Sequence, residues 1–351
     1  MSAAATPGWF PHLLDPINDR VLLVAKSEQE YRDAAFLDER SLRQDAQRQI
    51  VDWSALAAAV PPDVRRDVQY IFHIGHVGST LISRLLGELP QIFALREPLI
   101  VRTFDEMLTE RGRPEALWDP AAIPARVDLL AALLSRTFRP EQRALVKATS
   151  FTSERAADLV PPGSRALLLY ASPQRWMETI LAGENSRRDL RATAQSRLRR
   201  LHRRTGEHRW NLWEMSEGEK LAMAWAAEMT SLAQAEERLP EGATMWMDFD
   251  AFLEAPAESL QALATFFGVT IDPEEAKRLS RHPLMDRYSK AVDYEYGREQ
   301  REAALAEAGR QHADAITEGL RWLDAIIRGL PAMVRFSPFG LDGDVHGRPS
   351  P

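Results

Sequence analysis

The fold of this chain follows from one stretch of its sequence, Tyr70-Ile-Phe-His-Ile-Gly-His-Val-Gly-Ser-Thr-Leu-Ile-Ser-Arg-Leu-Leu86. An apolar run, Val68 to Ile74, enters a turn with Gly75 and Gly78, after which leucine and isoleucine recur at helical spacing. Glycine lets backbone amides approach an anion closely, and a helix start adds unpaired N–H groups and about half a positive charge. The stretch therefore predicts either an anion cradle or a buried strand–turn–helix in which Ser79 caps the helix.

The glycine turn differs from the G-x-x-x-x-G-K-[ST] pattern of nucleoside triphosphatases, because no lysine precedes Ser79. The hydroxyls of Ser79 and Thr80 could still cap the helix and donate hydrogen bonds to an anion. The turn thus indicates phosphate binding without indicating a triphosphatase.

The composition is ordinary for a globular protein, with 45% hydrophobic and 27% charged residues in 351. The longest apolar runs are far below the roughly 18 residues of a membrane-spanning helix, and the N-terminus lacks the features of a secretory signal. The sequence has no cysteine, which excludes disulfides, thiolate metal sites and cysteine nucleophiles. We therefore expect a cytoplasmic protein that does not associate with a membrane.

The net charge and the spacing of the histidines argue against two further kinds of ligand, nucleic acid and metal ions. The net charge of −7 does not favour nucleic-acid binding. The eight histidines show no H-E-x-x-H or other metal-ligand spacing, so no metal site is predicted.

Short apolar runs that alternate with helical patterns predict the rest of the fold. Strands are expected at residues 144–148, 166–171 and 244–249, with helical periodicity between them. Such alternation predicts right-handed crossovers and a mainly parallel sheet in an α/β fold. Ligands on these sheets bind beyond the carboxyl ends of the strands, where the glycine turn would lie.

The two ends of the chain are less regular. We expect an irregular arm over residues 1–20, a helix opened by the capping box Ser27–Glu30, and one long helix or two over residues 298–328. The predicted organisation is an N-terminal extension, an α/β domain with a basic helical insert, and a C-terminal tail, at residues 1–60, 61–330 (insert about 186–212) and 331–351.

Four segments, in this order, carry a family resemblance: His76-Val-Gly-Ser-Thr-Leu81, Leu169-Tyr-Ala-Ser-Pro173 through Thr179, Met247-Asp-Phe-Asp-Ala-Phe-Leu-Glu-Ala-Pro256 through Phe266-Phe-Gly268, and Arg287-Tyr-Ser-Lys290. Together they resemble the bacterial sulfotransferase family, which uses 3'-phosphoadenosine 5'-phosphosulfate (PAPS) as donor. The resemblance implies a P-loop NTPase-like central parallel sheet flanked by helices, with helical extensions. It also implies transfer of a sulfuryl group from PAPS to a hydroxyl or amine of a small-molecule or peptide acceptor, without a metal.

The resemblance also implies which residues hold the donor. The glycine turn would bind the 5'-phosphosulfate through Gly75, His76, Val77, Gly78, Ser79 and Thr80. The 3'-phosphate would face Thr179, Arg187 and Lys290.

Two residues depart from the family pattern. His76 stands where the family has lysine or arginine, and Ala171 stands where it has an arginine for the 3'-phosphate. A charge-assisted hydrogen bond contributes about 1.5–3 kcal/mol, so one lost arginine could weaken donor binding by about 10- to 100-fold. Two other readings stay open: an enzyme of the same fold with another phosphorylated nucleotide as donor, and a non-catalytic binding protein.

Two further residues resemble catalytic groups of the family. Glu97 would act as the base that takes the acceptor's proton, or it would simply pair with Arg96 or Arg102. Lys147 would stabilise charge on the bridging oxygen together with His76, or its side chain would reach out of the sheet edge.

The remaining candidates each have a structural reading. Residues 187–204 hold eight arginines, which form either a solvated helix offset by acidic neighbours elsewhere in the chain or a basic lid over the 3'-phosphate. Thr149 and Ser150 would bind the phosphosulfate or cap a helix. His73 is expected to be a hydrogen-bonded structural residue, and the tryptophans at 210 and 213 belong to the core or to an acceptor pocket.

Overall fold

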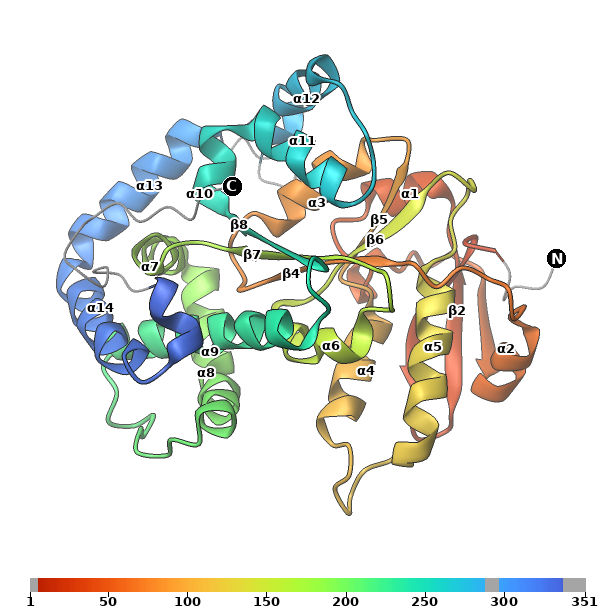
Figure 1. Ribbon diagram of the computed structural model, residues 1–351, viewed down its shortest axis with the longest axis horizontal. Helices are drawn as coiled ribbons and strands as arrows, with labels where there is room; N and C mark the ends of the chain where they lie inside the picture. Colours follow the sequence, from red (N-terminus) through yellow and green to blue (C-terminus); the bar gives the residue numbers. More distant parts are fainter. Residues whose placement is uncertain (1–5, 288–296, 337–351) are drawn as a thin grey trace.

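A five-stranded parallel sheet forms the centre of the molecule (Figure 1). The computed structural model describes residues 6–287 and 297–336. The strand order is β5-β6-β4-β7-β8, so β4, the first of these strands in the chain, lies in the middle. The predicted central parallel sheet is confirmed. Four strands agree with the predicted apolar segments to within one or two residues: β4 Gln69–His73, β6 Arg143–Lys147, β7 Ala166–Tyr170 and β8 Thr244–Asp248. The fifth strand is β5 Ile92–Arg96.

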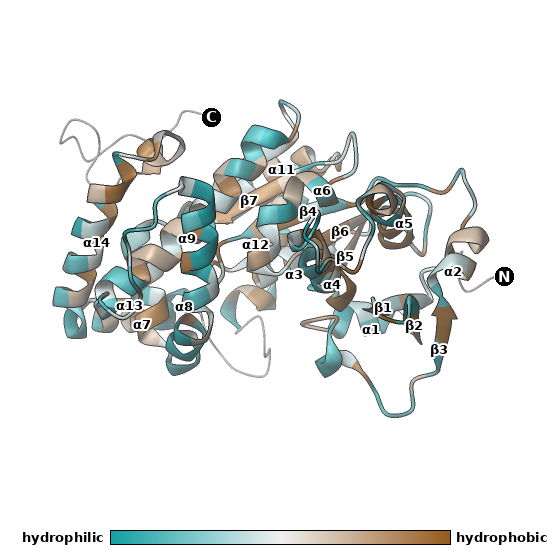
Figure 2. Cartoon of the chain, turned by 90° about the horizontal axis from the view of Figure 1, so that it is seen from below, coloured by the Kyte–Doolittle hydropathy of each residue, from teal (hydrophilic) through white to brown (hydrophobic). Residues whose placement is uncertain are grey.

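Helices cover both faces of this sheet, which explains why the middle residues of most of its strands are apolar and buried. Every residue of β4 and β5 is buried, and the sheet is among the hydrophobic segments in Figure 2. Figure 1 shows α3 and α11 on one face and α4, α6 and α9 on the other. The helices of this region are α3 Ser79–Gly87, α4 Leu99–Thr109, α5 Ile123–Leu134, α6 Ala156–Leu159, α7 Pro173–Ala182, α8 Glu184–Thr205, α9 Glu217–Arg238, α10 Phe249–Glu254, α11 Pro256–Phe266 and α12 Pro273–Ser280.

The strand order places the glycine turn at the point where the chain changes direction. From β4 the chain crosses to β5 and β6 on one side, and it then returns past β4 to β7 and β8 on the other. In open α/β sheets the crevice at such a switch point is where ligands bind. Two buried tryptophans hold this region: Trp176 donates to the Gly75 carbonyl oxygen at 2.9 Å, and Trp225 donates to that of Ala171 at 3.0 Å.

The prediction of an irregular arm over residues 1–20 is wrong for the part of it that the structure describes, because two strands begin there. β1 (Trp9–Asp15), β2 (Arg20–Ala25) and β3 (Arg48–Asp52) form an antiparallel sheet. The pairing of β1 with β2 shifts register between Pro11 and Leu13, which interrupts the alternation of apolar residues by which a strand is recognised. The predicted capping box does open helix α1 (Glu28–Asp33), and η2 (Glu39–Ser41) and α2 (Trp53–Ala59) complete the region.

The C-terminal region consists of two helices rather than one. α13 (Arg298–Gln311) and α14 (Ala313–Ile327) meet at His312, and η6 (Pro331–Phe336) follows. Lys290 and most of the predicted tail lie outside the described residues. No helix within residues 6–287 or 297–336 is long and apolar enough to cross a membrane.

Candidate functional site

A cavity of about 1030 Å³ opens at the carboxyl ends of β4, β5 and β6. Its walls come from the glycine turn, from the segment joining α7 to α8, from α10, and from residues within 280–287 and 297–304. The cavity brings together most of the predicted site residues: Gly75, His76, Val77, Gly78, Ser79, Thr80, Glu97, Lys147 and Thr179.

The glycine turn has an unusual backbone. Gly75, His76 and Gly78 have φ angles of +81°, +58° and +66°, in the left-handed region that glycine tolerates and histidine rarely adopts. Helix α3 begins at Ser79, so the first N–H groups of its first turn have no partner within the helix. These N–H groups and the helix dipole make the turn suited to an anion.

Gly78 is required for a further reason that the sequence did not reveal. A Cβ atom at this position would lie 2.0 Å from the Phe249 ring. Phe249 begins α10 and lines the same cavity, with the Arg301 guanidinium 5.3 Å from the centre of its ring. The glycine therefore admits an aromatic ring from α10, in addition to any close approach of a ligand.

Two histidines flank the turn and have different surroundings. His73 Nδ1 accepts from the Gly75 N–H at 3.0 Å, so Nε2 carries the proton and donates to the Ala148 carbonyl oxygen at 2.9 Å. It is a hydrogen-bonded structural residue, as predicted. His76 Nδ1 lies 3.2 Å from Ser186 Oγ, and its Nε2 lies 3.7 Å from Asp189 Oδ2, both on α8.

Lys147 and Glu97 form an ion pair at the edge of the sheet. The Lys147 ammonium donates to Glu97 Oε1, and the lysine side chain is only 1% exposed. The alternative partners considered for Glu97 are therefore not used, because Arg96 donates instead to the carbonyl oxygens of Arg32 and Ala34. The lysine also does not reach out of the sheet, since it ends β6 inside the protein.

The residues predicted to face a 3'-phosphate are less well assembled. Thr179 lines the cavity and donates to the Arg175 carbonyl oxygen at 2.8 Å, while Ala171 is buried and offers no polar side-chain group. Arg187 lies on α8 but is not among the residues that line the cavity. Arg287, which opens the fourth segment of the family resemblance, does line the cavity, and so do three arginines that the sequence did not single out: Arg281, Arg298 and Arg301.

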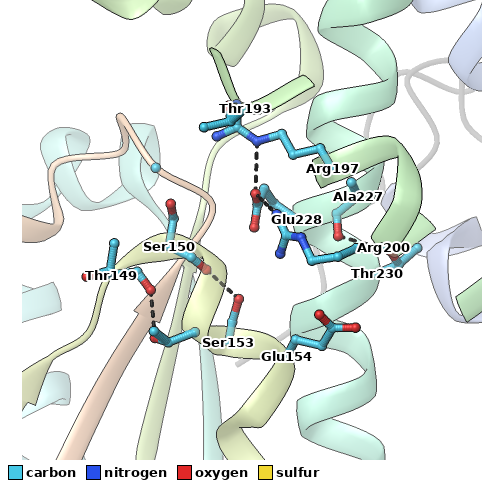
Figure 3. A network of polar contacts seen from close by, with 12 residues as sticks. Thr149, Ser150, Ser153, Glu154, Thr193, Arg197, Arg200, Ala227, Glu228 and Thr230 are labelled. Carbon is cyan, nitrogen blue, oxygen red and sulfur yellow. Dashed lines mark hydrogen bonds and ion pairs between the residues drawn. The ribbon is translucent and has the colours of Figure 1, made fainter. Parts of the chain in front are cut away.

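Four of the eight arginines of α8 pair with carboxylates of neighbouring elements, and Figure 3 shows two of them, Arg197 and Arg200, beside Glu228. Arg197 and Arg200 donate to Glu228 on α9 at 3.0 and 2.7 Å, and Arg203 and Arg204 pair with Glu154 on the 3-10 helix η4 (Ser150–Arg155). Burial alone would raise the pKa of Glu228, but Arg200 and Arg197 hold it below its usual value. The predicted acidic neighbours are therefore present, as Glu228 and Glu154, but Arg197, Arg200 and Arg204 are largely buried rather than solvated, and none of the four arginines lines the cavity as a lid would.

The remaining candidate residues differ in whether they border the cavity. Thr149 and Ser150 line the cavity, whereas Trp210 packs on Trp322 and Trp213 is 80% exposed, and neither tryptophan borders the cavity. Within the described residues no group of three or more histidines and carboxylates is arranged to hold a metal ion.

Comparison with known proteins gives similar architectures only. No family model and no curated protein matches this sequence. The solved structures that resemble the chain include bacterial sulfotransferases. A sulfotransferase domain from the curacin biosynthetic pathway has 13% identity and a TM-score of 0.38, covering 72% of this chain and 99% of that domain. A sulfotransferase from Mycobacterium avium has 14% identity and a TM-score of 0.38 (73% and 78% covered), and a mouse sulfotransferase complexed with PAP has 12% and 0.35 (74% and 86% covered).

Proposed function

We propose that this protein transfers a sulfuryl group from PAPS to a hydroxyl or amine of a small-molecule or peptide acceptor. One observation carries the proposal: a single cavity joins the left-handed glycine turn at the start of α3 to the Lys147–Glu97 pair. An anion cradle next to a buried cation and a carboxylate suits the transfer of an anionic group from a donor oxygen to an oxygen or nitrogen of an acceptor.

The residues present fit such a donor. The first-turn N–H groups of α3, the hydroxyls of Ser79 and Thr80, and His76 would hold the 5'-phosphosulfate. Arg281 and Arg287 line the same cavity and could supply the cation that is missing at Ala171. Thr179 and Arg187 remain proposals for the 3'-phosphate.

The chemistry assigned to the ion pair is a direct displacement at sulfur. The acceptor's oxygen or nitrogen forms the new bond to sulfur while the bond from sulfur to the bridging oxygen breaks, and the electron pair stays on that oxygen. Lys147 would stabilise the resulting negative charge, and Glu97 would take the proton from the acceptor. His76 would add charge stabilisation at the turn when it is protonated.

The buried alanine at position 171 favours a second candidate, a donor without a 3'-phosphate such as a nucleoside triphosphate. Thermal unfolding with 3',5'-adenosine bisphosphate, AMP and ATP distinguishes the two. Ligand at 100 times its dissociation constant adds about 2.7 kcal/mol of stability. We expect the bisphosphate to stabilise the protein at concentrations about 10- to 100-fold lower than AMP does. Equal stabilisation by bisphosphate and AMP would rule out PAPS as the donor. Stronger stabilisation by ATP than by the bisphosphate would support the second candidate.

A further inference from the structure

The outer face of the N-terminal sheet carries a row of apolar side chains. Leu13 of β1 pairs with Leu22 of β2, and Leu22 pairs with Ile50 of β3. Residues directly opposite each other in antiparallel strands lie on the same face. Leu13 and Ile50 are 37% and 68% exposed, whereas Leu14 and Val21, which point to the other face, are buried in the core. The row therefore faces away from the core, and it ends at the edge of the sheet with Ile50.

β3 is the edge strand, and it lies at the margin of the molecule in Figure 2. The Ala25 N–H donates to the carbonyl oxygen of Gln47, which precedes β3, at 2.9 Å. Because such bonds involve every second residue of an antiparallel strand, residues 47, 49 and 51 bond to β2, and residues 48, 50 and 52 turn their backbone groups outward. Among the described residues β3 pairs with β2 alone, and no hydrogen bond from elsewhere reaches the backbone N–H or C=O groups of Arg48 and Ile50.

The sequence of β3, Arg48-Gln49-Ile50-Val51-Asp52, is complementary to itself in one register. Two copies of one edge strand that are related by a twofold axis pair antiparallel. Their outward groups meet when even-numbered residues stand opposite each other. If Ile50 stands opposite Ile50 of a second copy, Arg48 of each copy stands opposite Asp52 of the other. A shift by two residues in either direction puts a charged residue opposite Ile50 and loses both charge pairs.

The charges within one chain are arranged for this register. Asp52 pairs with Arg20 at 3.1 Å, and Arg20 stands opposite Asp15 of β1, which gives a row of alternating sign. Arg48 has no carboxylate within ion-pair distance among the described residues, and its guanidinium donates to the Arg43 carbonyl oxygen at 2.9 Å. Opposite charges directly across antiparallel strands stabilise the pairing, and like charges oppose it. Arg48 of a second copy would continue the row beyond Asp52.

We propose that this protein forms a twofold dimer in which the β3 strands of two copies pair and join the two N-terminal sheets into one. The dimer continues the apolar row from Ile50 of one copy to Ile50 of the other. β3 has no proline or glycine, and its pairing with β2 has no register shift, so it lacks devices that commonly prevent edge strands from associating. Five residues bury a small area, and we expect a dissociation constant on the order of 10 µM.

The first test is sedimentation equilibrium of the full chain from about 1 to about 500 µM. The mass should rise from that of one chain to that of two across this range. Ile50→Asp places two carboxylates opposite each other and should weaken the dimer about tenfold or more. Because Ile50 is 68% exposed, this variant should fold. Trp213→Asp, at an 80% exposed position between α8 and α9, should associate like the wild-type protein.

A charge exchange tests the register. Arg48→Asp places two carboxylates opposite each other at both ends of the paired strands, and Asp52→Arg places two guanidinium groups there. Each variant alone should therefore dimerise about tenfold more weakly than the wild-type protein. An equal mixture of the two restores an opposite charge at both positions and should form a heterodimer about as tight as the wild-type dimer.

Three results would overturn the proposal. They are a wild-type protein that stays monomeric over the whole range, a dimer that Ile50→Asp leaves unchanged, and folded charge variants that do not associate when mixed. Circular dichroism of each variant establishes that it is folded. If a charge variant does not fold, the comparison of Ile50→Asp with Trp213→Asp decides.

Discussion

The backbone N–H of Glu97 donates to the carbonyl oxygen of Lys147 at 2.7 Å, and the Lys147 ammonium donates back to the Glu97 carboxylate. Glu97 directly follows β5, and Lys147 is the last residue of the neighbouring strand β6. The two lie close together because Arg96 of β5 pairs in register with Lys147. Glu97 has a φ of +49°, a strained conformation for a residue with a side chain. Such strain is typical of functional positions, and here it accompanies the ion pair.

Removing only one member of this pair should be costly. Lys147→Met leaves the largely buried Glu97 carboxylate without its cation, and we expect a loss of about 3–5 kcal/mol in the free energy of unfolding. The double variant Lys147→Met/Glu97→Gln should be more stable than Lys147→Met alone, because no uncompensated charge remains. Urea denaturation of the wild-type protein, the two single variants Lys147→Met and Glu97→Gln, and the double variant gives the coupling energy between the two side chains. Additive losses would show that the two side chains do not interact.

The approach of Phe249 to Gly78 can be separated from the backbone strain at Gly78. Gly206 has a similar φ of +70°, but no atom lies within 4 Å of a Cβ added there. Gly206→Ala should therefore cost about 1–2 kcal/mol for the left-handed backbone alone. Gly78→Ala should cost clearly more in urea denaturation, whereas in a protein that already carries Phe249→Ala it should cost about as much as Gly206→Ala does. Equal losses at the two glycines would contradict the contact with Phe249.

His76 is expected to make donor binding depend on pH. If it replaces the usual cation of the turn, affinity for 3',5'-adenosine bisphosphate should rise from pH 8 to pH 6, since imidazolium binds an anion better than imidazole does. His76→Arg should bind more tightly and show a flatter pH dependence, because guanidinium stays charged. Titration calorimetry of both proteins at three pH values measures this. If the wild-type protein and His76→Arg show identical pH profiles, His76 does not bind the donor and only contacts Ser186 and Asp189 on α8.

Asp105 on α4 should make the free energy of unfolding fall as the pH rises. Most carboxylates have the opposite effect, because their pKa is lowered in the folded protein. Burial raises the pKa of Asp105 to about 7, so the folded state binds a proton that the unfolded state releases above about pH 4. This group's contribution to stability is complete below pH 4 and is lost as the pH rises toward 7, by up to about 4 kcal/mol. Asp105→Asn should remove this slope, which urea denaturation at pH 5 and pH 8 detects. Asp63→Asn, at an exposed position, should change stability by less than about 0.5 kcal/mol and keep the slope.

Much of the scaffold could be predicted because the relevant interactions are local. The apolar run before Gly75 and the helical spacing after Ser79 involve residues a few positions apart, and the capping box Ser27–Glu30 lies within one turn. The hairpin of β1 and β2 was missed because its irregular register hides the alternation of apolar residues. Sequence patterns of this kind predict elements, and their order predicts the parallel sheet.

The sequence by itself determined the central sheet, the glycine turn and the position of Glu97 and Lys147 near the carboxyl ends of their strands. Only the tertiary structure decided which charges meet: Lys147 with Glu97, the α8 arginines with Glu228 and Glu154, and Arg281 and Arg287 with the cavity. The physical reason is that an ion pair depends on the register of strands and the packing of helices far apart in the chain. Local periodicity carries no information about such distances.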